Sequence, residues 1–342
     1  EGTASAIDIT PTFSGPVWFV SKEGNDNSGE GSQGSPFASI THAIKQVNEG
    51  DTIIVKEGTY QNEKIEVYGN TPNIVLMSES GAEKTILDAQ NGFQSTILGM
   101  HHDWDTEGDG IDSSFQVIGF TFTRATFSAV EIVNRRTQNN SYFPMRPKFK
   151  NCTFVNNNRT QDDGGAIYIW GGAEPIFENC TFENNSTVRN GGAIAIYSGA
   201  EHTISNHVNR SHFRNSTFKK NKVIPSDGYQ GFIGGGAIDI SGWSTATIVN
   251  CLFDSNRVET KNVFSSGYGG AINAHGEFSP FKSLEENELR IESSIIKNNI
   301  VEHAGNGYGG GLSIDKKPAR ITNTLIANNQ LKNTNQFYYQ TQ

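Results

Sequence analysis

The stretch FKNCTFVNNN, residues 149–158, decides the fold because the chain repeats it five more times. The later copies are FENCTFENNS (177–186), FRNSTFKKNK (213–222), IVNCLFDSNR (248–257), IESSIIKNNI (291–300) and ITNTLIANNQ (321–330). Each copy carries Phe or Ile at its sixth position and Asn at its ninth. Such self-similarity is typical of a solenoid, in which every repeat forms one structural unit and contacts only its neighbours.

A second phrase, GGAI, falls between the copies of the first. It occupies residues 164–167, 191–194, 235–238 and 269–272, and GGGL follows the same pattern at 309–312. The first glycines lie 27, 44, 34 and 40 residues apart, which fits a minimal coil with loops of different lengths. Because glycine has no Cβ, the pair lets the backbone turn tightly into the next strand.

Alternation of side chains within each short strand separates the core from the surface. Successive residues of a strand point to opposite faces, so Cys152 and Phe154 face one way and Thr153 the other. Stacked copies then form an inward column of Phe and Ile beside a column of Cys, Ser and Thr. The three cysteines, Cys152, Cys180 and Cys251, are therefore predicted to be free, buried and stacked.

The ninth position of the repeat predicts a column of asparagines at one corner of the stack. Its members are Asn157, Asn185, Asn221, Asn256, Asn299 and Asn329. Asparagine tolerates a left-handed backbone at a corner. Stacked side-chain amides can also bond to one another, which predicts an asparagine ladder.

These patterns predict an all-β, single-domain, right-handed parallel β-helix with a short N-terminal capping helix; the handedness follows the rule for parallel crossovers. Residues 1–60 are predicted to form the N-terminal segment and capping helix leading into the first coil. Residues 61–342 form the β-helix, with regular coils from about 149. The cap is expected where Phe37, Ile40, Ile44 and Val47 fall at helical spacing. The C-terminal segment carries no comparable pattern, so end-to-end self-association through the last coil is a further option.

Composition excludes two classes of protein. The net charge is −9, the pI is near 5.4 and the basic residues are scattered, whereas a nucleic-acid-binding protein would carry a basic stripe. No apolar run approaches the roughly 18 residues that span a membrane.

Two features resemble known families. The stretch WFVSKEGNDNSGEGSQGSPFASITHAIKQVNEGDTIIVKEGTY (18–60) resembles the N-terminal segment of pectate-lyase-like β-helix proteins secreted by bacteria. The paired FxxN and GGAI phrases resemble the repeats of chlamydial polymorphic outer-membrane proteins, which are surface adhesins. The resemblance implies an extracellular or cell-surface bacterial protein, but not its activity, because this scaffold carries lyases, hydrolases, adhesins and structural proteins.

The GGAI strands predict a candidate binding face. If Ile167 and Ile169 point inward, then Tyr168 and Trp170 point outward, and the same phase applies to each coil. Exposed rings beside polar groups suit sugars, which stack on an apolar face and hydrogen-bond at their edges. The predicted carbohydrate-binding residues are Glu131, Tyr168, Trp170, Tyr197, Trp243, Asn273 and Asp315. Ordinary solvent-facing residues of a sheet are the alternative.

Catalysis would require acid and base groups on the same face. Asp239 and His275 fall on adjacent coils and form one candidate pair. Glu131 lies three coils from Asp239, roughly 14 Å away, which exceeds the separation of glycosidase carboxylates. Lyases of the resembled family combine calcium-binding carboxylates with a Lys or Arg base, and no Lys or Arg is expected in the outward column near these acids.

The segment HHDWDTEGDGID (101–112) is the candidate metal site. Asp103, Asp105, Glu107, Asp109 and Asp112 place hard oxygen ligands close together, which suits calcium. A solvated acidic loop is the alternative.

Three functional hypotheses follow. The first is a non-catalytic module that binds a polysaccharide or cell-surface glycan, or that builds an adhesive or structural surface. The second is a polysaccharide lyase or glycoside hydrolase acting on the outer face. The third is a protein that stacks end to end through its C-terminal coil.

Overall fold

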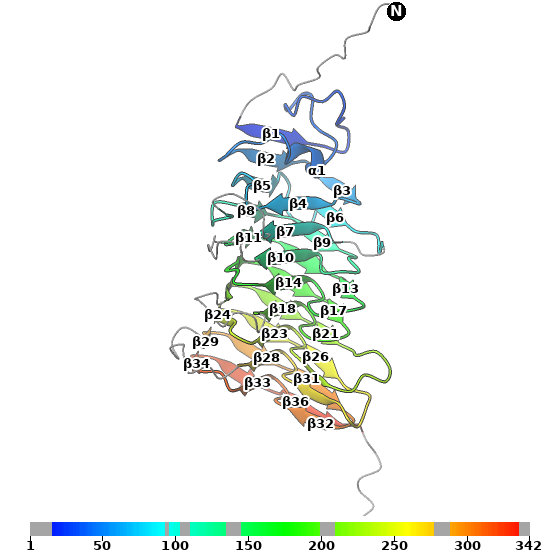
Figure 1. Cartoon of the computed structure of the whole chain (residues 1–342), viewed down its shortest axis with the longest axis vertical. Helices are drawn as coiled ribbons and strands as arrows, with labels where there is room; N and C mark the ends of the chain where they lie inside the picture. Colours follow the sequence, from blue (N-terminus) through cyan, green and yellow to red (C-terminus); the bar gives the residue numbers. More distant parts are fainter. Residues whose placement is uncertain are drawn as a thin grey trace, which may run out of the picture.

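Equivalent strands of successive coils pair in parallel and form stacked sheets (Figure 1). The structure, a computed structural model, describes residues 16–92, 96–102, 110–134, 145–198, 209–276 and 288–334. Within these residues there are five sheets, of ten, nine, eight, six and three strands. Each regular coil passes through the ten-, nine-, six- and eight-stranded sheets in that order, and some coils add a strand to the three-stranded sheet.

The bounds of the strands follow the repeats. The ten-stranded sheet contains β1 (Val17–Val20), β2 (Thr52–Val55), β5 (Val75–Ser78), β8 (Gln116–Ile118), β11 (Lys148–Lys150), β15 (Ile176–Glu178), β19 (Arg210–Arg214), β24 (Thr245–Val249), β29 (Leu289–Glu292) and β34 (Ala319–Thr322). The nine-stranded sheet contains β3 (Gly58–Gln61), β6 (Thr85–Asp88), β9 (Thr121–Thr123), β12 (Thr153–Val155), β16 (Thr181–Glu183), β20 (Thr217–Lys219), β25 (Leu252–Asp254), β30 (Ile295–Lys297) and β35 (Leu325–Ala327).

The other three sheets complete the coils. The eight-stranded sheet contains β4 (Ile65–Tyr68), β7 (Leu98–His102), β10 (Val130–Asn134), β14 (Ile167–Trp170), β18 (Ile194–Tyr197), β23 (Ile238–Ser241), β28 (Ile272–His275) and β33 (Leu312–Asp315). The six-stranded sheet contains β13 (Asn158–Arg159), β17 (Ser186–Thr187), β21 (Lys222–Val223), β26 (Arg257–Glu259), β31 (Ile300–His303) and β36 (Gln330–Asn333). The three-stranded sheet contains β22 (Phe232–Gly234), β27 (Ser266–Tyr268) and β32 (Asn306–Tyr308).

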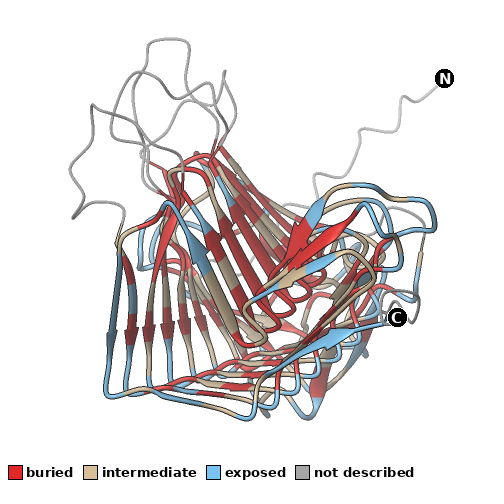
Figure 2. Cartoon of the chain, turned by 90° about the horizontal axis from the view of Figure 1, so that it is seen from below, coloured by how far each residue is buried: buried red, intermediate tan, exposed pale blue. Residues whose placement is uncertain are grey.

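The core is a set of side-chain columns that run along the stack. Seen end on, buried residues recur at matching places along the stacked strands (Figure 2). The ring centroids of Phe154 and Phe182 are 4.8 Å apart, and those of Phe218 and Phe253 are 4.6 Å apart. These separations match the spacing of paired strands, so each coil adds one ring to the column. Cys152, Cys180 and Cys251 are buried and free, as predicted.

Asparagines form a ladder beside this core. The Nδ2 of Asn185 donates to the Oδ1 of Asn221 at 3.0 Å, and Asn221 donates in the same way to Asn256. Each Nδ2 also donates to a backbone carbonyl of the preceding coil, as from Asn221 to Phe182 at 2.9 Å. The predicted left-handed backbone falls one residue earlier, at positions such as Asn184 with φ 55°. The ladder asparagines from Asn157 to Asn299 are fully buried and Asn329 in the last described coil is partly exposed, whereas a corner residue such as Asn184 faces outward.

The glycine pair serves two separate purposes. Gly191 adopts φ 68°, which permits the turn into β18. A Cβ on Gly192 would lie 2.1 Å from the carbonyl oxygen of Gly236 in the next coil. The first glycine therefore meets a dihedral requirement and the second a packing requirement between coils.

The predicted N-terminal helix is a single turn. Helix α1 (Ile40–Ala43) begins after Ser39, whose hydroxyl accepts from the backbone N–H of His42. It is shorter than the span from Phe37 to Val47, although all the apolar residues of that pattern are buried. It packs on β1 and β4 at the N-terminal end of the stack (Figure 1).

Candidate functional site

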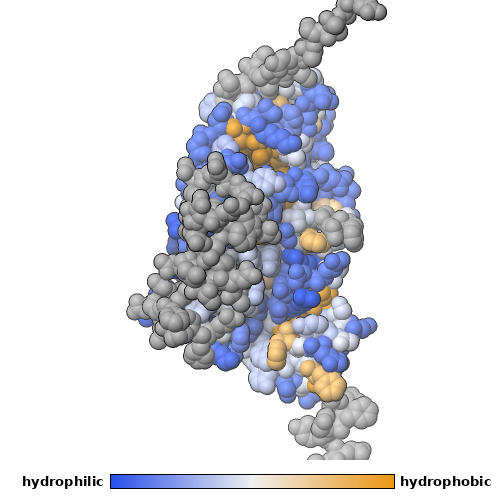
Figure 3. Space-filling model, viewed as in Figure 1, coloured by the Kyte–Doolittle hydropathy of each residue, from blue (hydrophilic) through white to orange (hydrophobic). Residues whose placement is uncertain are grey.

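The outer face of the eight-stranded sheet carries two columns of side chains in register. The first column is Glu66, Gly99, Glu131, Tyr168, Ala195, Asp239, Asn273 and Ser313. The second column is Tyr68, His101, Val133, Trp170, Tyr197, Ser241, His275 and Asp315. Ile167 and Ile169 lie in the core, so the predicted strand phase is confirmed. The described part of this face is largely hydrophilic, with hydrophobic patches toward either end (Figure 3).

The aromatic residues of the predicted strip lie next to one another. Tyr168 and Trp170 of β14 are partly exposed, and Tyr197, opposite Trp170 on β18, is exposed. The Arg159 guanidinium lies 5.1 Å from the centroid of the Tyr168 ring. Trp243 follows β23 outside the two columns and is partly buried.

A third column borders this face, which we call the flanking column: Asp163, Asn190, Gly234, Tyr268 and Tyr308. Each member directly precedes the first glycine of a GGAI phrase. Asn190 donates to the Asp163 carboxylate at 2.8 Å and accepts from the Gly234 N–H at 2.9 Å. The Tyr268 and Tyr308 rings stack at 4.8 Å. Sequence reasoning missed this column, although its fixed place before the glycines is the signal that identifies it.

The flanking column meets the sheet face directly. A Cβ on Gly234 would lie 2.7 Å from the Cγ of Asn273, so this position points at the first column. Tyr268 and Tyr308 occupy the same register position in the next two coils. Burial raises the pKa of Tyr268, and the nearby Asp315 carboxylate adds to that effect. The two rings therefore stand beside the C-terminal half of the face.

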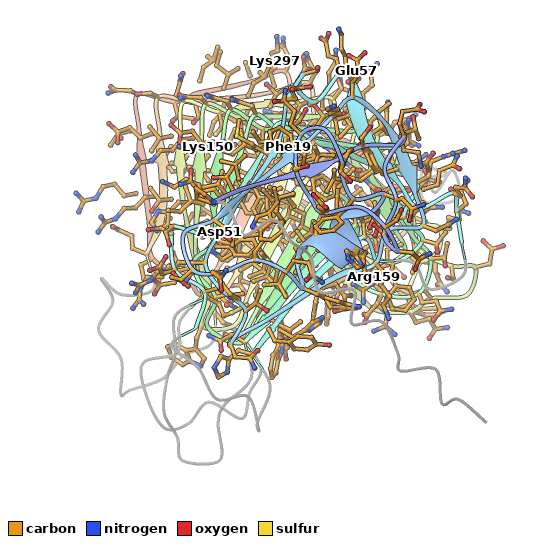
Figure 4. All side chains as sticks on the ribbon, turned by 90° about the horizontal axis from the view of Figure 1, so that it is seen from above. Phe19, Asp51, Glu57, Lys150, Arg159 and Lys297 are labelled. Atoms are coloured by element: carbon orange, nitrogen blue, oxygen red, sulfur yellow. The ribbon has the colours of Figure 1, made fainter. Side chains whose placement is uncertain are left out.

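At the N-terminal half of the face, two glutamates lie on either side of a glycine. Glu66 and Glu131 are the register neighbours of Gly99 on β4 and β10. The Nε2 of His101 is 3.3 Å from the Oε2 of Glu66. The Nη1 of Arg159 is 3.2 Å from the Oε1 of Glu131. Figure 4 places Arg159 on the side of the coil opposite Lys297, which belongs to the nine-stranded sheet.

The two glutamates have opposite pKa shifts. The hydrogen bond from His101 is the largest effect on Glu66 and lowers the pKa of its carboxyl below the usual 4.5. Burial is the largest effect on Glu131 and raises the pKa of its carboxyl, although Arg159 opposes it. Relative to an ordinary glutamate, the surroundings therefore stabilise the ionised form of Glu66 and the protonated form of Glu131.

The structure corrects the predicted surroundings of Asp239. The carboxylate points to the outer side of β23 as expected, but only 4% of the residue is exposed. It accepts from Ser241 at 2.6 Å and from Asn273 at 2.7 Å, and burial raises its pKa to about 7. His275 lies opposite Ser241, and its Nδ1 is 3.1 Å from the Oδ2 of Asp315. The contact that His275 makes is therefore with Asp315 in the following coil.

The two outward columns contain no Lys or Arg, as expected, but two cations approach these acids from other parts of the coils. Arg159 reaches Glu131 from the six-stranded sheet. Lys317 follows β33, and its Nζ donates to the carbonyl of Ser244 at 2.6 Å. Its pKa falls to about 8 because of burial, and the Asp239 carboxylate partly offsets that fall. Both cations come from outside the two columns, where strand alternation cannot reveal them.

The predicted metal residues are mostly outside the described part of the chain. Asp103, Asp105, Glu107 and Asp109 fall there. Asp112 is exposed, and its carboxylate accepts from the backbone and hydroxyl of Ser114. Among the described residues, no group of three or more His, Cys, Asp or Glu side chains is placed to hold a metal ion.

Comparison with known proteins identifies the class. The family model described as a right handed beta helix region matches residues 111–283, just over half of the 342 residues, and the chain belongs to that family. No curated protein matches the chain.

Three solved structures are similar to this chain at low identity. A "Glycoside hydrolase" is 8% identical, with a TM-score of 0.43 over 90% of this chain and 96% of that one. A "Pectin methylesterase from Carrot" is 11% identical, with a TM-score of 0.36 over 92% and 89% of the two chains. A "Rhamnogalacturonan lyase" is 12% identical, with a TM-score of 0.36 over 91% and 87%. Likeness at this level says nothing about the substrate of this chain. Among the described residues, no helix has the length and apolarity to span a membrane.

Proposed function

We propose that this protein binds a polysaccharide or cell-surface glycan along the outer face of the eight-stranded sheet. The observation that carries the proposal is the adjacent placement of Tyr168, Trp170 and Tyr197 among charged and polar side chains. Tyr268 and Tyr308 supply further ring surface at the border of the same face. Sugar rings stack on aromatic faces while their hydroxyls bond to polar neighbours. A location outside the cell or on a bacterial surface, where adhesive glycan contacts form, is part of this proposal.

Affinity electrophoresis through gels that contain neutral or acidic polysaccharides tests the proposal. The doubly substituted variant Trp170→Ala, Tyr197→Ala should bind the retained polysaccharide at least about tenfold more weakly, because two stacking contacts are lost. Phe264→Ala is the control, since that ring is 74% exposed and belongs to neither column. A chain that no polysaccharide in the panel retards, or a double variant that is retarded as strongly as wild type, would overturn the proposal.

Glycoside hydrolysis is the second candidate function. It is favoured by the placement of Glu66 and Glu131 on either side of Gly99, since two carboxyl groups on one sugar-binding face are what such hydrolysis requires. Asp239 and His275 remain candidates for an acid–base role. Asp239 accepts two hydrogen bonds from neighbouring side chains, which fits a structural role better.

Calcium binding by the acidic segment remains a prediction. The same gels run with calcium or with a chelator test it, because a calcium-dependent site would lose retention in the chelator. Retention that is unchanged by the chelator would assign the segment to a solvated loop.

A further inference from the structure

We propose that Glu131 and Glu66 are the general acid and the general base of a glycoside-hydrolase site centred above Gly99. The inference rests on the proposed glycan binding and assigns the reaction that the same face carries out. It differs from the sequence-based hypothesis, which placed the acid–base pair at Asp239 and His275. The substrate class is a polysaccharide whose chain crosses the eight-stranded sheet at β7.

The geometry of Gly99 brings the reacting groups together. A Cβ at this position would lie 2.5 Å from the Oε2 of Glu66 and 2.5 Å from the Nε2 of His101. The glycine therefore leaves the space in which these two side chains meet. Glu66 leans over β7 toward Glu131, and the two residues are separated by two strand spacings, roughly 10 Å at the backbone. Because the Glu66 side chain extends over Gly99 toward Glu131, we infer that the two carboxyl groups lie closer together than the backbone does, within the range of about 5 to 9.5 Å that glycosidases use.

Both glutamates are reachable by a ligand and are held by partners. Their side chains are 30% and 19% exposed, and that of His101 is 23% exposed. The Nζ of Lys64 lies 3.5 Å from the Oε1 of Glu66. On the other side, Arg159 donates to Glu131 and to the Ser128 hydroxyl, and only 7% of its side chain is exposed. The cations thus fix the orientation of each carboxyl group.

The charges around each carboxyl group set its protonation. Glu66 faces His101 and Lys64, which favour its ionised form. Glu131 faces Arg159, His101, Glu66 and Asp162, and its burial outweighs the favourable charges. An acid with a raised pKa and a base with a lowered one are the arrangement that lets two like side chains take different roles.

The proposed reaction hydrolyses one glycosidic bond with one water molecule. Glu131 transfers its proton to the glycosidic oxygen while the C1–O bond breaks and its electron pair passes to that oxygen. Glu66 takes a proton from a water molecule, whose oxygen forms the new bond to C1. The products are a hydroxyl on the leaving sugar and a hemiacetal on the other, and proton exchange with solvent returns both carboxyl groups to their starting states.

Reducing-end assays on the retained polysaccharide, from about pH 3 to pH 8, test the assignment. Glu131→Gln and Glu66→Gln should each lower kcat at least about 100-fold, while the Tyr168, Trp170 and Tyr197 strip still retains both variants in the gel. Glu183→Gln is the control, since Glu183 lies on the nine-stranded sheet. Gly99→Ala should also lose hydrolysis, because its Cβ would displace Glu66 and His101.

The dependence of the hydrolysis rate on pH distinguishes a catalytic role of the two glutamates from a merely structural one. As the pH increases, activity should rise when Glu66 ionises, at a pH below 4.5, the ordinary pKa of a glutamate. It should fall again when Glu131 loses its proton, at a pH above 4.5. His101→Asn should shift the rising limb to higher pH, because the largest effect that lowers the Glu66 pKa is removed. Retention without new reducing ends at any pH would overturn the catalytic assignment and leave glycan binding intact. Absence of retention would overturn both, and hydrolysis that survives Glu131→Gln would overturn the role of that residue.

Discussion

At the scale of single residues, the fold depends on buried polar side chains that satisfy one another. Asn221 shows the pattern: its amide donates to Asn256 and to the Phe182 carbonyl, and its oxygen accepts from the backbone and side chain of Asn185. Asn185, Asn256 and Asn299 repeat this arrangement, so the ladder holds these successive coils in register. Low local dielectric makes such a network costly to interrupt.

Substitution of Asn221 by Ala should destabilise the protein by about 2–4 kcal/mol, because Asn185 and the Phe182 carbonyl would lose buried partners. Asn158→Ala is the control, since Asn158 is exposed and its side chain accepts from the Ser186 hydroxyl at the surface, and it should cost less than about 0.5 kcal/mol. Urea denaturation followed by circular dichroism measures both. Equal midpoints for the two variants would show that the ladder contributes little.

At the scale of the strand and its turn, each glycine pair leads into a strand of the eight-stranded sheet through a space that admits no side chain. Backbone atoms that cannot rotate away fill the space beside both glycines: a Cβ on Gly191 would lie 2.1 Å from the carbonyl oxygen of Ile194 in its own turn, whereas one on Gly192 would meet backbone of the next coil. Lys222 of β21 and Gly236 both lie within 2.6 Å of the Cβ that Gly192 lacks. Steric exclusion of this kind explains why the phrase survives in coils whose loops differ greatly in length.

We expect Gly192→Ala to destabilise the protein by about 3 kcal/mol or more, because the coils would have to separate locally. Gly34→Ala is a matched control: a Cβ there would meet no atom within 4 Å, and the backbone needs no positive φ. That change should be neutral or slightly stabilising. Thermal unfolding of both variants is the measurement, and an unchanged melting temperature for Gly192→Ala would contradict the expectation.

Elements could be predicted from the sequence where the repeat is regular, because alternation and a fixed stacking position determine which side chains face inward. The core column through Phe154 and Phe182 and the outward phase of Tyr168 are examples. Partners that come from another sheet could not be predicted, since strand alternation describes only one sheet at a time. Arg159 beside Glu131 is such a case, as is the burial of Asp239. Glu66 was missed because β4 lies in the irregular first coils, where the repeat gives no alignment.

At the scale of the whole molecule, the two ends of the described stack differ. The N-terminal coils carry α1, and their core residues are buried. At the other end Ile326 and Leu331, whose register partners Ile296 and Val301 are buried, are 47% and 52% exposed. Leu325, on the outer side of β35, is 56% exposed. An apolar strand surface with free edges favours pairing with another chain. We propose that this end is where copies of the protein self-associate.

Leu325→Glu combined with Ile326→Glu should therefore shift the protein toward the monomer in sedimentation velocity runs at rising concentration, because like charges would meet across the contact. Stability should change little, since both side chains are already exposed. Lys219→Glu on β20, away from this end, is the control. Wild-type protein that stays monomeric at every concentration would refute the proposal.

The chain advances 27 residues from Gly164 to Gly191 and forms a coil with very short loops. This coil contains a stacked ring, Phe182, a ladder asparagine, Asn185, and a glycine pair. Such a coil carries the same contacts on its upper and lower sides, so duplication of its coding segment would insert a working unit without disturbing those around it. Descendants of this chain could in this way evolve longer faces for longer glycans by unequal recombination, one strand spacing at a time.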